Sequence, residues 1–339
     1  MIKALGKKPW GNHLEKIKQS ANYSNGAFQN ISKTEVMSPD VSYTKVFKDY
    51  FFGVPKDNKP SQPLPFVKTD LKNIQEEKPV IVWFGHSSYF IRINGKNILV
   101  DPVFSGSASP FSFMVKAYKG SNEYKPKDFP EIDLLILTHD HYDHLDYKTI
   151  KELQPKVKHI CCSLGLASHL NHWKISNPFT EFDWWDSANI SQIEIIAAPA
   201  RHFTGRGLKR AQTLWSSFIV KSGDYNLYIG GDSGYDAHFK TIGEMYGPFD
   251  IAFLESGQYN TSWRNIHMMP EETVQATADL KAKVLMPVHW AKFSLALHSW
   301  NEPIKRVMKK AQEINVKVVA PLIGEKVLLG EEFETKEWW

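Results

Sequence analysis

Short apolar runs separated by polar turns dominate the chain after its first 77 residues. Many are rich in β-branched or aromatic residues and have the length of a strand: PVIVWFG (79–85), SYFIRI (88–93), NILV (97–100), LLILT (134–138), KHICC (158–162), IEIIAA (193–198), WSSFIV (215–220), NLYIG (226–230), DIAFL (250–254), KVLMPV (283–288) and VKVVA (316–320). They predict β-strands. The dipeptide Asn94-Gly95 lies between the second and third runs and is typical of a tight hairpin. LLILT is apolar throughout, which indicates a strand buried on both faces.

Helical segments are expected between these runs, near residues 146–153, 164–171, 270–280 and 302–313. The third begins at Pro270-Glu271-Glu272, because proline suits a first helical turn and acidic side chains suit the positive end of a helix. Strands and helices therefore mix along the whole chain, and the series opens with hairpins. This order predicts an α/β protein in which a sheet-containing sandwich is covered by helices.

Residues 1–77 have a different character. They are polar, interrupted by Pro and Gly, and include the loop-like stretch KDNKPSQPLPF. We interpret them as an N-terminal extension with short helical pieces, too irregular for an independent domain. Its aromatic residues are expected to pack on the main domain, residues 78–339; they are Phe47, Tyr50, Phe51 and Phe52.

Composition and charge limit the classes of binding partner that we expect for this protein. Hydrophobic residues make up 42% of the 339 residues and charged residues 23%, as in ordinary globular proteins. The net charge of +4 is too small to indicate a nucleic-acid partner, so we expect none. The N-terminal lysines fit a solvated terminus, with attraction to anionic lipid as the alternative, so peripheral membrane contact is left open. The sequence carries no signal for an oligomeric state.

Cysteine usage and the lack of long apolar segments indicate the compartment. Cys161 and Cys162 are adjacent, and a disulfide between neighbours is strained, so they are predicted to be buried thiols. Such usage fits a reducing environment. No run of 18 apolar residues is present, and the first residues contain no apolar signal region. We therefore expect a cytoplasmic protein, with membrane association as the open alternative.

Candidate chemistry is concentrated directly after LLILT, in the run His139-Asp140-His141-Tyr142-Asp143-His144. Residues at the carboxyl end of a buried strand lie where α/β folds place their sites. Imidazole nitrogens and carboxylate oxygens are ligands that zinc and related ions accept. In extended backbone His139 and His141 can point to the same side, and Asp143 and His144 can reach a second ion close by. The alternative is a polar surface loop before a helix whose N-terminus is capped by Asp146, but this interpretation leaves the three histidines unexplained.

Three further motifs end apolar runs: Ala198-Pro199-Ala200-Arg201-His202, Gly230-Gly231-Asp232-Ser233-Gly234 and Met286-Pro287-Val288-His289-Trp290. With His-x-His-x-Asp-His before them, their order resembles the metallo-β-lactamase fold superfamily over roughly residues 79–330. The resemblance implies a four-layer αββα sandwich and two divalent metal ions. It implies the following ligands: His139, His141 and His202 for one ion, Asp143, His144 and His289 for the other, and Asp232 as the bridge.

The ligand types suit Zn²⁺, with Mn²⁺ and Fe²⁺ also compatible. Flavo-diiron relatives carry Glu where this chain has His141, and this difference favours hydrolysis over redox chemistry. The expected nucleophile is a hydroxide held by the metal ions, since two cations lower the pKa of a water from about 15.7 to around 7. Asp143 is expected to accept a proton as well as bind metal, and His267 is a candidate proton donor to the leaving group.

One branch of the superfamily is more similar than the others. The motifs Trp83-Phe84-Gly85-His86-Ser87-Ser88, Ile98-Leu99-Val100-Asp101-Pro102-Val103-Phe104 and His267-Met268-Met269-Pro270-Glu271-Glu272 resemble the branch of the N-acylphosphatidylethanolamine-hydrolysing phospholipase D, as does Phe51-Phe52-Gly53. The resemblance implies a phosphodiesterase acting on a small molecule or a phospholipid. Two alternatives stay open: a sugar-phosphate lactonase, like the neighbouring ascorbate-6-phosphate lactonases, and a metal-binding sensor without turnover. The complete ligand set argues against the sensor.

Several residues near these motifs have weaker signals. His86 is a candidate for a position behind the ligands or facing substrate, and a structural turn histidine is an equal alternative. Asp101 ends the strand NILV and either orients a ligand histidine by a hydrogen bond or fixes the turn before Pro102. Glu255, Ser256 and Gln258 are expected at the same rim. The remaining histidines are interpreted as structural or surface residues. Trp184 and Trp185 are interpreted as packing residues, with the lining of a lipid groove as the alternative.

Overall fold

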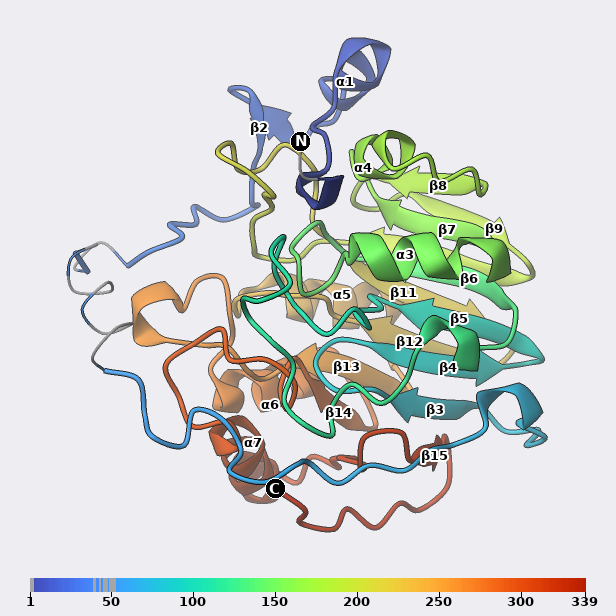
Figure 1. Ribbon diagram of the computed structural model, residues 1–339, viewed down its shortest axis with the longest axis vertical. Coiled ribbons are helices and arrows are strands. Elements are labelled where there is room, and N and C mark those ends of the chain that lie inside the picture. Colours follow the sequence, from blue (N-terminus) through green and yellow to red (C-terminus); the bar gives the residue numbers. More distant parts are fainter. Residues whose placement is uncertain (1–2, 39–40, 43, 45–47, 49–52) are drawn as a thin grey trace.

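Two β-sheets lie face to face, with helices on both outer sides (Figure 1). The structure is a computed structural model that describes residues 3–38, 41, 42, 44, 48 and 53–339. The aromatic residues Phe47, Tyr50, Phe51 and Phe52 lie outside the described residues, and so does the prediction that they pack on the main domain. The layers are those of an αββα sandwich, and the fold class predicted from the sequence is confirmed.

The first sheet has seven strands in the order β15-β3-β4-β5-β6-β7-β8. Their bounds are β3 Val80–Trp83, β4 Tyr89–Ile93, β5 Lys96–Val100, β6 Ile132–Leu137, β7 Val157–Ser163, β8 Phe179–Phe182 and β15 Lys326–Leu328. Strands β5 to β8 are parallel, and the others pair antiparallel. The predicted hairpin is confirmed, because Asn94 and Gly95 join β4 to β5 with positive φ angles of 48° and 73°.

The second sheet has six strands in the order β14-β13-β12-β11-β10-β9. Their bounds are β9 Ser187–Ile190, β10 Ile193–Ala198, β11 Ser217–Ser222, β12 Tyr225–Ile229, β13 Ile251–Glu255 and β14 Leu285–Val288. Strands β12, β13 and β14 are parallel to one another. Carboxyl ends of parallel strands therefore meet at one edge of each sheet, where the loops that carry the candidate ligands begin.

The apolar pattern of the strands separates the core into layers. In β6, Leu134 and Ile136 face the second sheet, whereas Leu135 and Leu137 face the outer helices. Every residue of this strand is buried, as its unbroken apolar run predicted. The alternation of side chains along the strand thus supplies both the core between the sheets and the core beneath the helices.

Helices cover both outer faces of the sandwich. Side chains of α3 (Tyr147–Leu153) and α4 (Ala167–His172) pack on the seven-stranded sheet. Side chains of α5 (His238–Tyr246), α6 (Pro270–Asp279) and α7 (Glu302–Ile314) pack on the six-stranded sheet, which lies behind in Figure 1. Pro270 begins α6 as predicted, and the Glu272 carboxylate accepts a hydrogen bond from the Met269 backbone N–H.

Some elements differ from the sequence prediction. The prediction of a strand at residues 316–320 is wrong, because only a single bridge joins Val318 to Leu285. The next backbone donor, Ala320, bonds to the Thr335 hydroxyl instead, and Pro321 has no N–H to continue a ladder. The second predicted helix begins later than expected because Gly165 has a φ of +97°, which a right-handed helix excludes.

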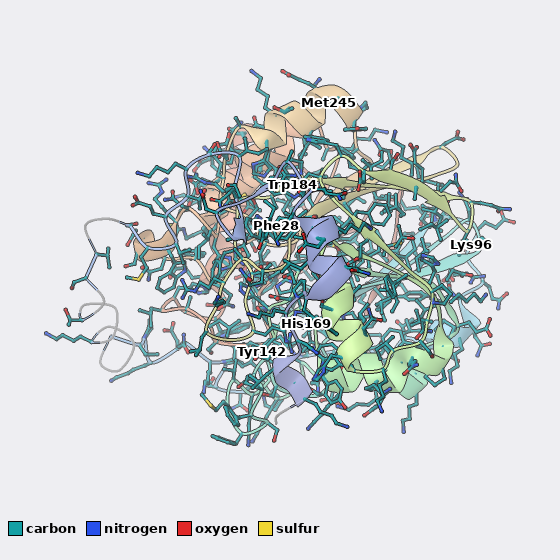
Figure 2. All side chains as sticks on the ribbon, turned by 90° about the horizontal axis from the view of Figure 1, so that it is seen from above. Phe28, Lys96, Tyr142, His169, Trp184 and Met245 are labelled. Carbon is teal, nitrogen blue, oxygen red and sulfur yellow. The ribbon has the colours of Figure 1, made fainter. Side chains whose placement is uncertain are left out.

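The N-terminal extension crosses the main domain in several short pieces. It contains helix α1 (Gly11–Ile17) and the hairpin β1 (Tyr23–Ser24) and β2 (Ala27–Phe28). Phe28 packs with Trp184 and Trp215 in a separate apolar cluster, and Figure 2 shows α1 beside Phe28 and Trp184. The packing interpretation is confirmed for Trp184, whereas Trp185 is 38% exposed and stacks on Tyr246 at the surface. Within the described residues, no helix is long and apolar enough to cross a membrane.

The C-terminal residues pack in a cluster of tryptophans that includes Trp290, two positions after β14. Trp338 stacks on Trp290 with ring centroids 5.2 Å apart, and Trp290 stacks on Trp83 at 5.4 Å. The indole N–H of Trp83 also donates to the carbonyl of His86 at 2.7 Å. These rings therefore support the backbone directly behind His86 and His289.

Candidate metal centre

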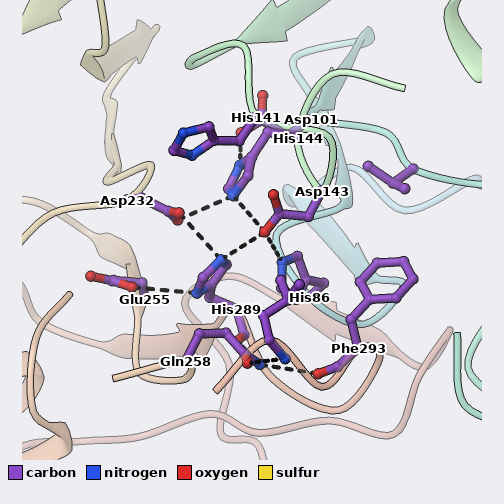
Figure 3. Close-up of polar contacts among 12 residues, drawn as sticks. His86, Asp101, His141, Asp143, His144, Asp232, Glu255, Gln258, His289 and Phe293 are labelled. Atoms are coloured by element: carbon purple, nitrogen blue, oxygen red, sulfur yellow. Dashed lines mark hydrogen bonds and ion pairs between the residues drawn. The ribbon is translucent and has the colours of Figure 1, made fainter. Parts of the chain in front are cut away.

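Loops from both sheets bring the candidate ligands together (Figure 3). The run from His139 to His144 follows β6, and His202 follows β10. Asp232 follows β12, and His289 follows β14 directly. Each of these strands ends in buried residues, so its carboxyl end is fixed in the core and the polar residues that follow are carried to the same point.

The first ligand group consists of His139, His141 and His202. The Nδ1 atom of His141 lies 3.0 Å from Nε2 of His139 and 3.2 Å from Nε2 of His202. His202 donates its other ring N–H to the carbonyl of Ile266 at 2.8 Å, which leaves Nε2 with a free lone pair. Nδ1 of His139 lies 3.0 Å from the Thr138 hydroxyl and is fixed in the same way.

The second ligand group consists of Asp143, His144 and His289. Oδ2 of Asp143 lies 3.3 Å from Nε2 of His289 and 3.7 Å from Nε2 of His144. His86 joins the same cluster, because its Nε2 lies 2.8 Å from Oδ2 of Asp143. All three histidines are almost completely buried.

Asp232 lies between the two groups. Its Oδ1 atom is 3.2 Å from Nε2 of His144, and its Oδ2 atom is 3.3 Å from Nε2 of His289. Oδ2 is also 3.7 Å from Nε2 of both His139 and His202. One carboxylate thus contacts histidines of both groups, which is the arrangement that a bridging ligand requires.

The donor set fits metal ions. Ligand atoms about 2.0–2.1 Å from one tetrahedral ion lie about 3.3 Å from each other, and the separations within each group are close to this value. Nε2 of His144 and Oδ1 of Asp232 are buried, and neither has a hydrogen-bond partner among the described residues. Because unpaired buried polar atoms are costly, their mutual approach is explained by a cation between them.

The two groups differ in their affinity for protons. Burial holds the pKa of His139 and His202 well below the ordinary value, and it also lowers the pKa of His141. Burial opposes protonation of His289 too, but the carboxylates of Asp232, Asp143 and Glu255 outweigh it and raise the pKa of His289 to about 10. The pKa of His144 is likewise raised well above its usual range, because Asp232 and Asp143 outweigh burial.

Asp101 supports the second group from behind. Its carboxylate accepts hydrogen bonds from Nδ1 of His144 at 2.8 Å, from the Thr138 hydroxyl at 2.5 Å and from the Thr138 backbone N–H at 2.9 Å. These bonds fix the ring so that Nε2 of His144 faces Asp232. The structure therefore gives Asp101 the ligand-orienting contact considered from the sequence.

Comparison with known proteins agrees with this arrangement. Residues 96–290 match a family model described as a β-lactamase superfamily domain, which is more than half of the chain. The chain belongs to the β-lactamase superfamily. This confirms the family resemblance predicted from the four motifs.

Individual relatives extend over most of the chain. An uncharacterised protein of Mycobacterium tuberculosis is 34% identical over 326 residues, which cover 95% of this chain and 88% of the relative. The N-acyl-phosphatidylethanolamine-hydrolyzing phospholipase D 1 of Caenorhabditis elegans is 31% identical over 256 residues, covering 68% and 70%. Among solved structures, the metallo hydrolase Igni18 of Ignicoccus hospitalis has a TM-score of 0.59 at 21% identity, covering 76% of this chain and all of that one; this likeness shows the fold alone.

His86 contacts the candidate ligand Asp143 and is not part of the cavity lining. Burial lowers the pKa of His86 to about 3, so the neutral ring donates its Nε2–H to Asp143. Its backbone N–H donates to the carbonyl of Trp290, and its carbonyl accepts from the N–H of His289. The Gly-His-Ser turn thereby fixes Asp143 and His289 relative to each other.

His267 and Glu255 form a pair that was not predicted from the sequence. Glu255 is the last residue of β13, and its fully buried carboxylate accepts a hydrogen bond from Nδ1 of His267 at 2.6 Å. The other carboxylate oxygen accepts from the backbone N–H of Met268 and of Ser233. The sequence placed Glu255 at the rim without a partner, because nothing in the spacing of these residues shows that the chain reverses toward β13.

A cavity of about 250 Å³ lies beside the candidate ligands. Its polar lining includes His141, Asp143, Asp232, His267 and His289. Its apolar lining includes Val36, Met37, Phe203, Trp263, Ile266 and Leu295. Since one space joins both linings, a molecule in it would contact candidate metal ligands and apolar side chains together.

Arg206, which carries no functional signal in the sequence, holds the shape of the candidate ligand loop, residues 139–144. Its guanidinium is buried and donates to the carbonyls of Asp140 at 2.6 Å and Leu145 at 2.8 Å, at either end of the ligand run. It also donates to the carbonyl of Ala4 at 2.7 and 3.0 Å and lies over the ring of Tyr142. Arg206 therefore joins the candidate ligand loop to the segment around Ala4.

The other histidines lie outside the ligand groups. His169 bonds to the Asp140 carboxylate, His238 to the Ser233 hydroxyl, and His298 accepts from the N–H of Gln258. Their structural interpretation agrees with these contacts. The same holds for His13 and His159, which bond to Glu181 and Thr180. Cys161 and Cys162 are free buried thiols, as predicted.

Proposed function

We propose that this chain is a dinuclear metal-dependent hydrolase that cleaves phosphodiesters, of the N-acylphosphatidylethanolamine phospholipase D-like type. The observation that carries the proposal is the contact of Asp232 with histidines of both ligand groups. A bridged pair of cations suits such a set, with Zn²⁺ favoured by its nitrogen and oxygen ligands. The similarity to the phospholipase of Caenorhabditis elegans supports the phosphodiester as substrate.

In this proposal, His139, His141 and His202 hold one ion and Asp143, His144 and His289 the other, with Asp232 between them. Bound cations would lower the pKa of a water at the site and stabilise negative charge that develops on the substrate. The chain's own residues provide orientation. Asp101 and His86 fix the ligands His144 and Asp143 by hydrogen bonds of 2.8 Å.

His267 is proposed to supply the proton that the leaving group needs. Its Nδ1 atom is held by Glu255, and the ring lines the cavity beside the metal ligands. Among the described residues Nε2 makes no hydrogen bond, so it is the ring nitrogen left to face a substrate. Asp143, which also lines the cavity, is proposed as the proton acceptor on the nucleophile's side.

The test is turnover of bis-p-nitrophenyl phosphate by protein supplied with Zn²⁺ or Mn²⁺, together with elemental analysis. We expect about two ions per chain, as a bridged site requires, and loss of turnover in Asp232→Ala with an unchanged circular dichroism spectrum. His159→Gln, which changes a histidine outside the site, is the matched control. Less than one ion per chain would refute the two-metal site. Normal ion content without phosphodiester turnover would favour the sugar-phosphate lactonase or the sensor.

The role of His267 has its own test. Replacement by Ala should lower kcat strongly for an alkyl leaving group, which must be protonated, and only weakly for p-nitrophenolate, which leaves without a proton. Glu255→Gln should show the same dependence to a smaller degree. An equal loss for both leaving groups would contradict the assignment.

We also propose peripheral contact with a membrane through the loop that carries Phe111, Phe113 and Met114. Phe111, Phe113 and Met114 are exposed apolar residues, with Phe113 at 73% of its full exposure. Phe113 shares a surface hollow with Lys59 and Lys116, so apolar and basic groups lie together. This combination suits an anionic lipid surface.

A further inference from the structure

Two apolar residues of the N-terminal extension line the cavity that contains the candidate ligands. Val36 and Met37 are half-buried, and they share the lining with His141, Asp143 and Asp232. They lie far outside residues 96–290, the part of the chain that matches the superfamily model. The extension therefore adds to the cavity a wall that the matched domain does not supply.

The segment that carries this wall is fastened at both ends. At one end, the side-chain amide of Asn30 bonds to both backbone groups of His202: its N–H donates to the carbonyl at 2.8 Å, and its oxygen accepts from the N–H at 3.1 Å. At the other end, Ser38 donates its backbone N–H to the carbonyl of Ser262 and its hydroxyl to the carbonyl of Thr261.

Contacts between these ends hold the middle of the segment. The Arg201 guanidinium donates to the Thr34 hydroxyl at 3.0 Å and to the carbonyl of Lys33 at 3.2 Å. The side chain of Asn265 donates to the carbonyl of Glu35 at 3.4 Å. Val36 and Met37 thus have positions set by the two loops that carry His202 and His267.

Apolar side chains continue from this wall around the cavity. Phe203 packs against the ring of His141 at 4.7 Å, and Trp263, Ile266 and Leu295 complete the lining. Covering the apolar surface beside a polar reaction centre with an apolar group of the ligand removes that surface from water and so favours binding. The polar half would bind a phosphate, and the apolar half would then contact whatever substituent the phosphate carries.

We propose that Val36 and Met37 make this site selective for phosphates that bear an alkyl substituent, with the extension acting as the specificity-determining wall. The proposal rests on the proposed function for the phosphate-binding half of the site. It predicts affinity that rises with the length of the alkyl group, by about fourfold for each methylene that becomes buried.

The experiment measures binding without turnover. A series of alkylphosphonates from methyl to octyl is titrated into the metal-loaded protein by calorimetry. In the unchanged protein, affinity should rise with each added methylene until the cavity is filled. In Met37→Ser, the step per methylene should fall below about twofold, because a polar group replaces part of the apolar wall.

Met245→Ser is the matched control, since Met245 is 57% exposed on α5 and lies outside the cavity lining (Figure 2). It should keep the full dependence on chain length. If Met37→Ser does not fold, Val36→Thr tests the same wall at similar volume. Equal chain-length dependence in the unchanged protein and the wall variants, or none in the unchanged protein, would overturn the proposal. If the unchanged, metal-loaded protein shows the chain-length dependence but does not hydrolyse phosphodiesters, the proposed function is overturned and the proposal about the wall is not.

Discussion

Binding of the two proposed ions should differ in its dependence on pH. Ligand histidines must be neutral to bind a cation. Burial lowers the pKa of His139, His141 and His202, so these rings are neutral near pH 7. The raised pKa values of His144 and His289 mean that both rings carry protons at the same pH in the metal-free protein.

The magnitude follows from these pKa directions. With a pKa of about 10, deprotonating His289 near pH 7.5 costs about 3 kcal/mol. An ion that displaces two protons binds about a hundredfold more tightly for each unit of pH, as long as the pH stays below both pKa values. The ion held by His139, His141 and His202 should show almost no such dependence above about pH 7.

The raised pKa of His289 also affects how the stability of the metal-free protein depends on pH. Because the folded-state pKa of His289 is raised, its protonation stabilises the fold fully below the ordinary value of about 6.5. This contribution is lost as the pH rises through about 10. The metal-free protein should therefore become less stable on alkalinisation over this interval, whereas the metal-loaded protein should not.

The assay is calorimetric titration with Zn²⁺ in buffers of different ionisation enthalpy, which reports the protons released. We expect about two protons with one ion and almost none with the other. His289→Ala should reduce the larger release to about one, while His202→Ala, the matched variant of the other group, should leave it unchanged. Equal release with both ions would refute the assignment of protons to His144 and His289.

Three further predictions address other parts of the structure. Asp101→Asn removes an acceptor from His144 and should weaken metal binding about 10–100-fold in a competition titration with a chelator, while the melting temperature stays close to that of the unchanged protein. Trp338→Ala removes the ring stacked on Trp290 and should lower the free energy of unfolding by about 2 kcal/mol, measured by urea denaturation; an unchanged midpoint would contradict the support assigned to the tryptophan cluster. Phe113→Asp should reduce sedimentation with anionic lipid vesicles without changing turnover of a soluble substrate, and unchanged sedimentation would rule out this loop as the membrane contact.

The strands of the two inner layers could be predicted because their apolar runs are short, β-branched and buried. The edge strand β9 could not be predicted in the same way. In β9, Ser187–Ile190, no residue is fully buried, so its sequence has no apolar run. Helix α5 was not predicted because two sequence signals for a helix are missing. No side chain caps its N-terminus, and Gly243, a poor helix former, lies within it.

The candidate ligands could be predicted because each follows a strand end and the ligand types occur in a known order. The contacts that orient these candidate ligands were harder to predict from the sequence. Asp101 and His144 are separated by 43 positions, and His267 lies 12 positions after Glu255, so only the fold brings each pair together. Arg206 carried no signal at all, because its partners are mostly backbone carbonyls, which look alike in every sequence.

The link between Arg206 and Ala4 also bears on the order of folding. These residues are separated by 202 positions, so the segment around Ala4 cannot take up its final contacts until Arg206 has been synthesised. Until then, the ligand loop lacks the guanidinium that joins its two ends. The loop that binds metal in the proposed function should therefore gain its final shape late, and an ion that binds earlier would meet histidines whose backbone is not yet fixed.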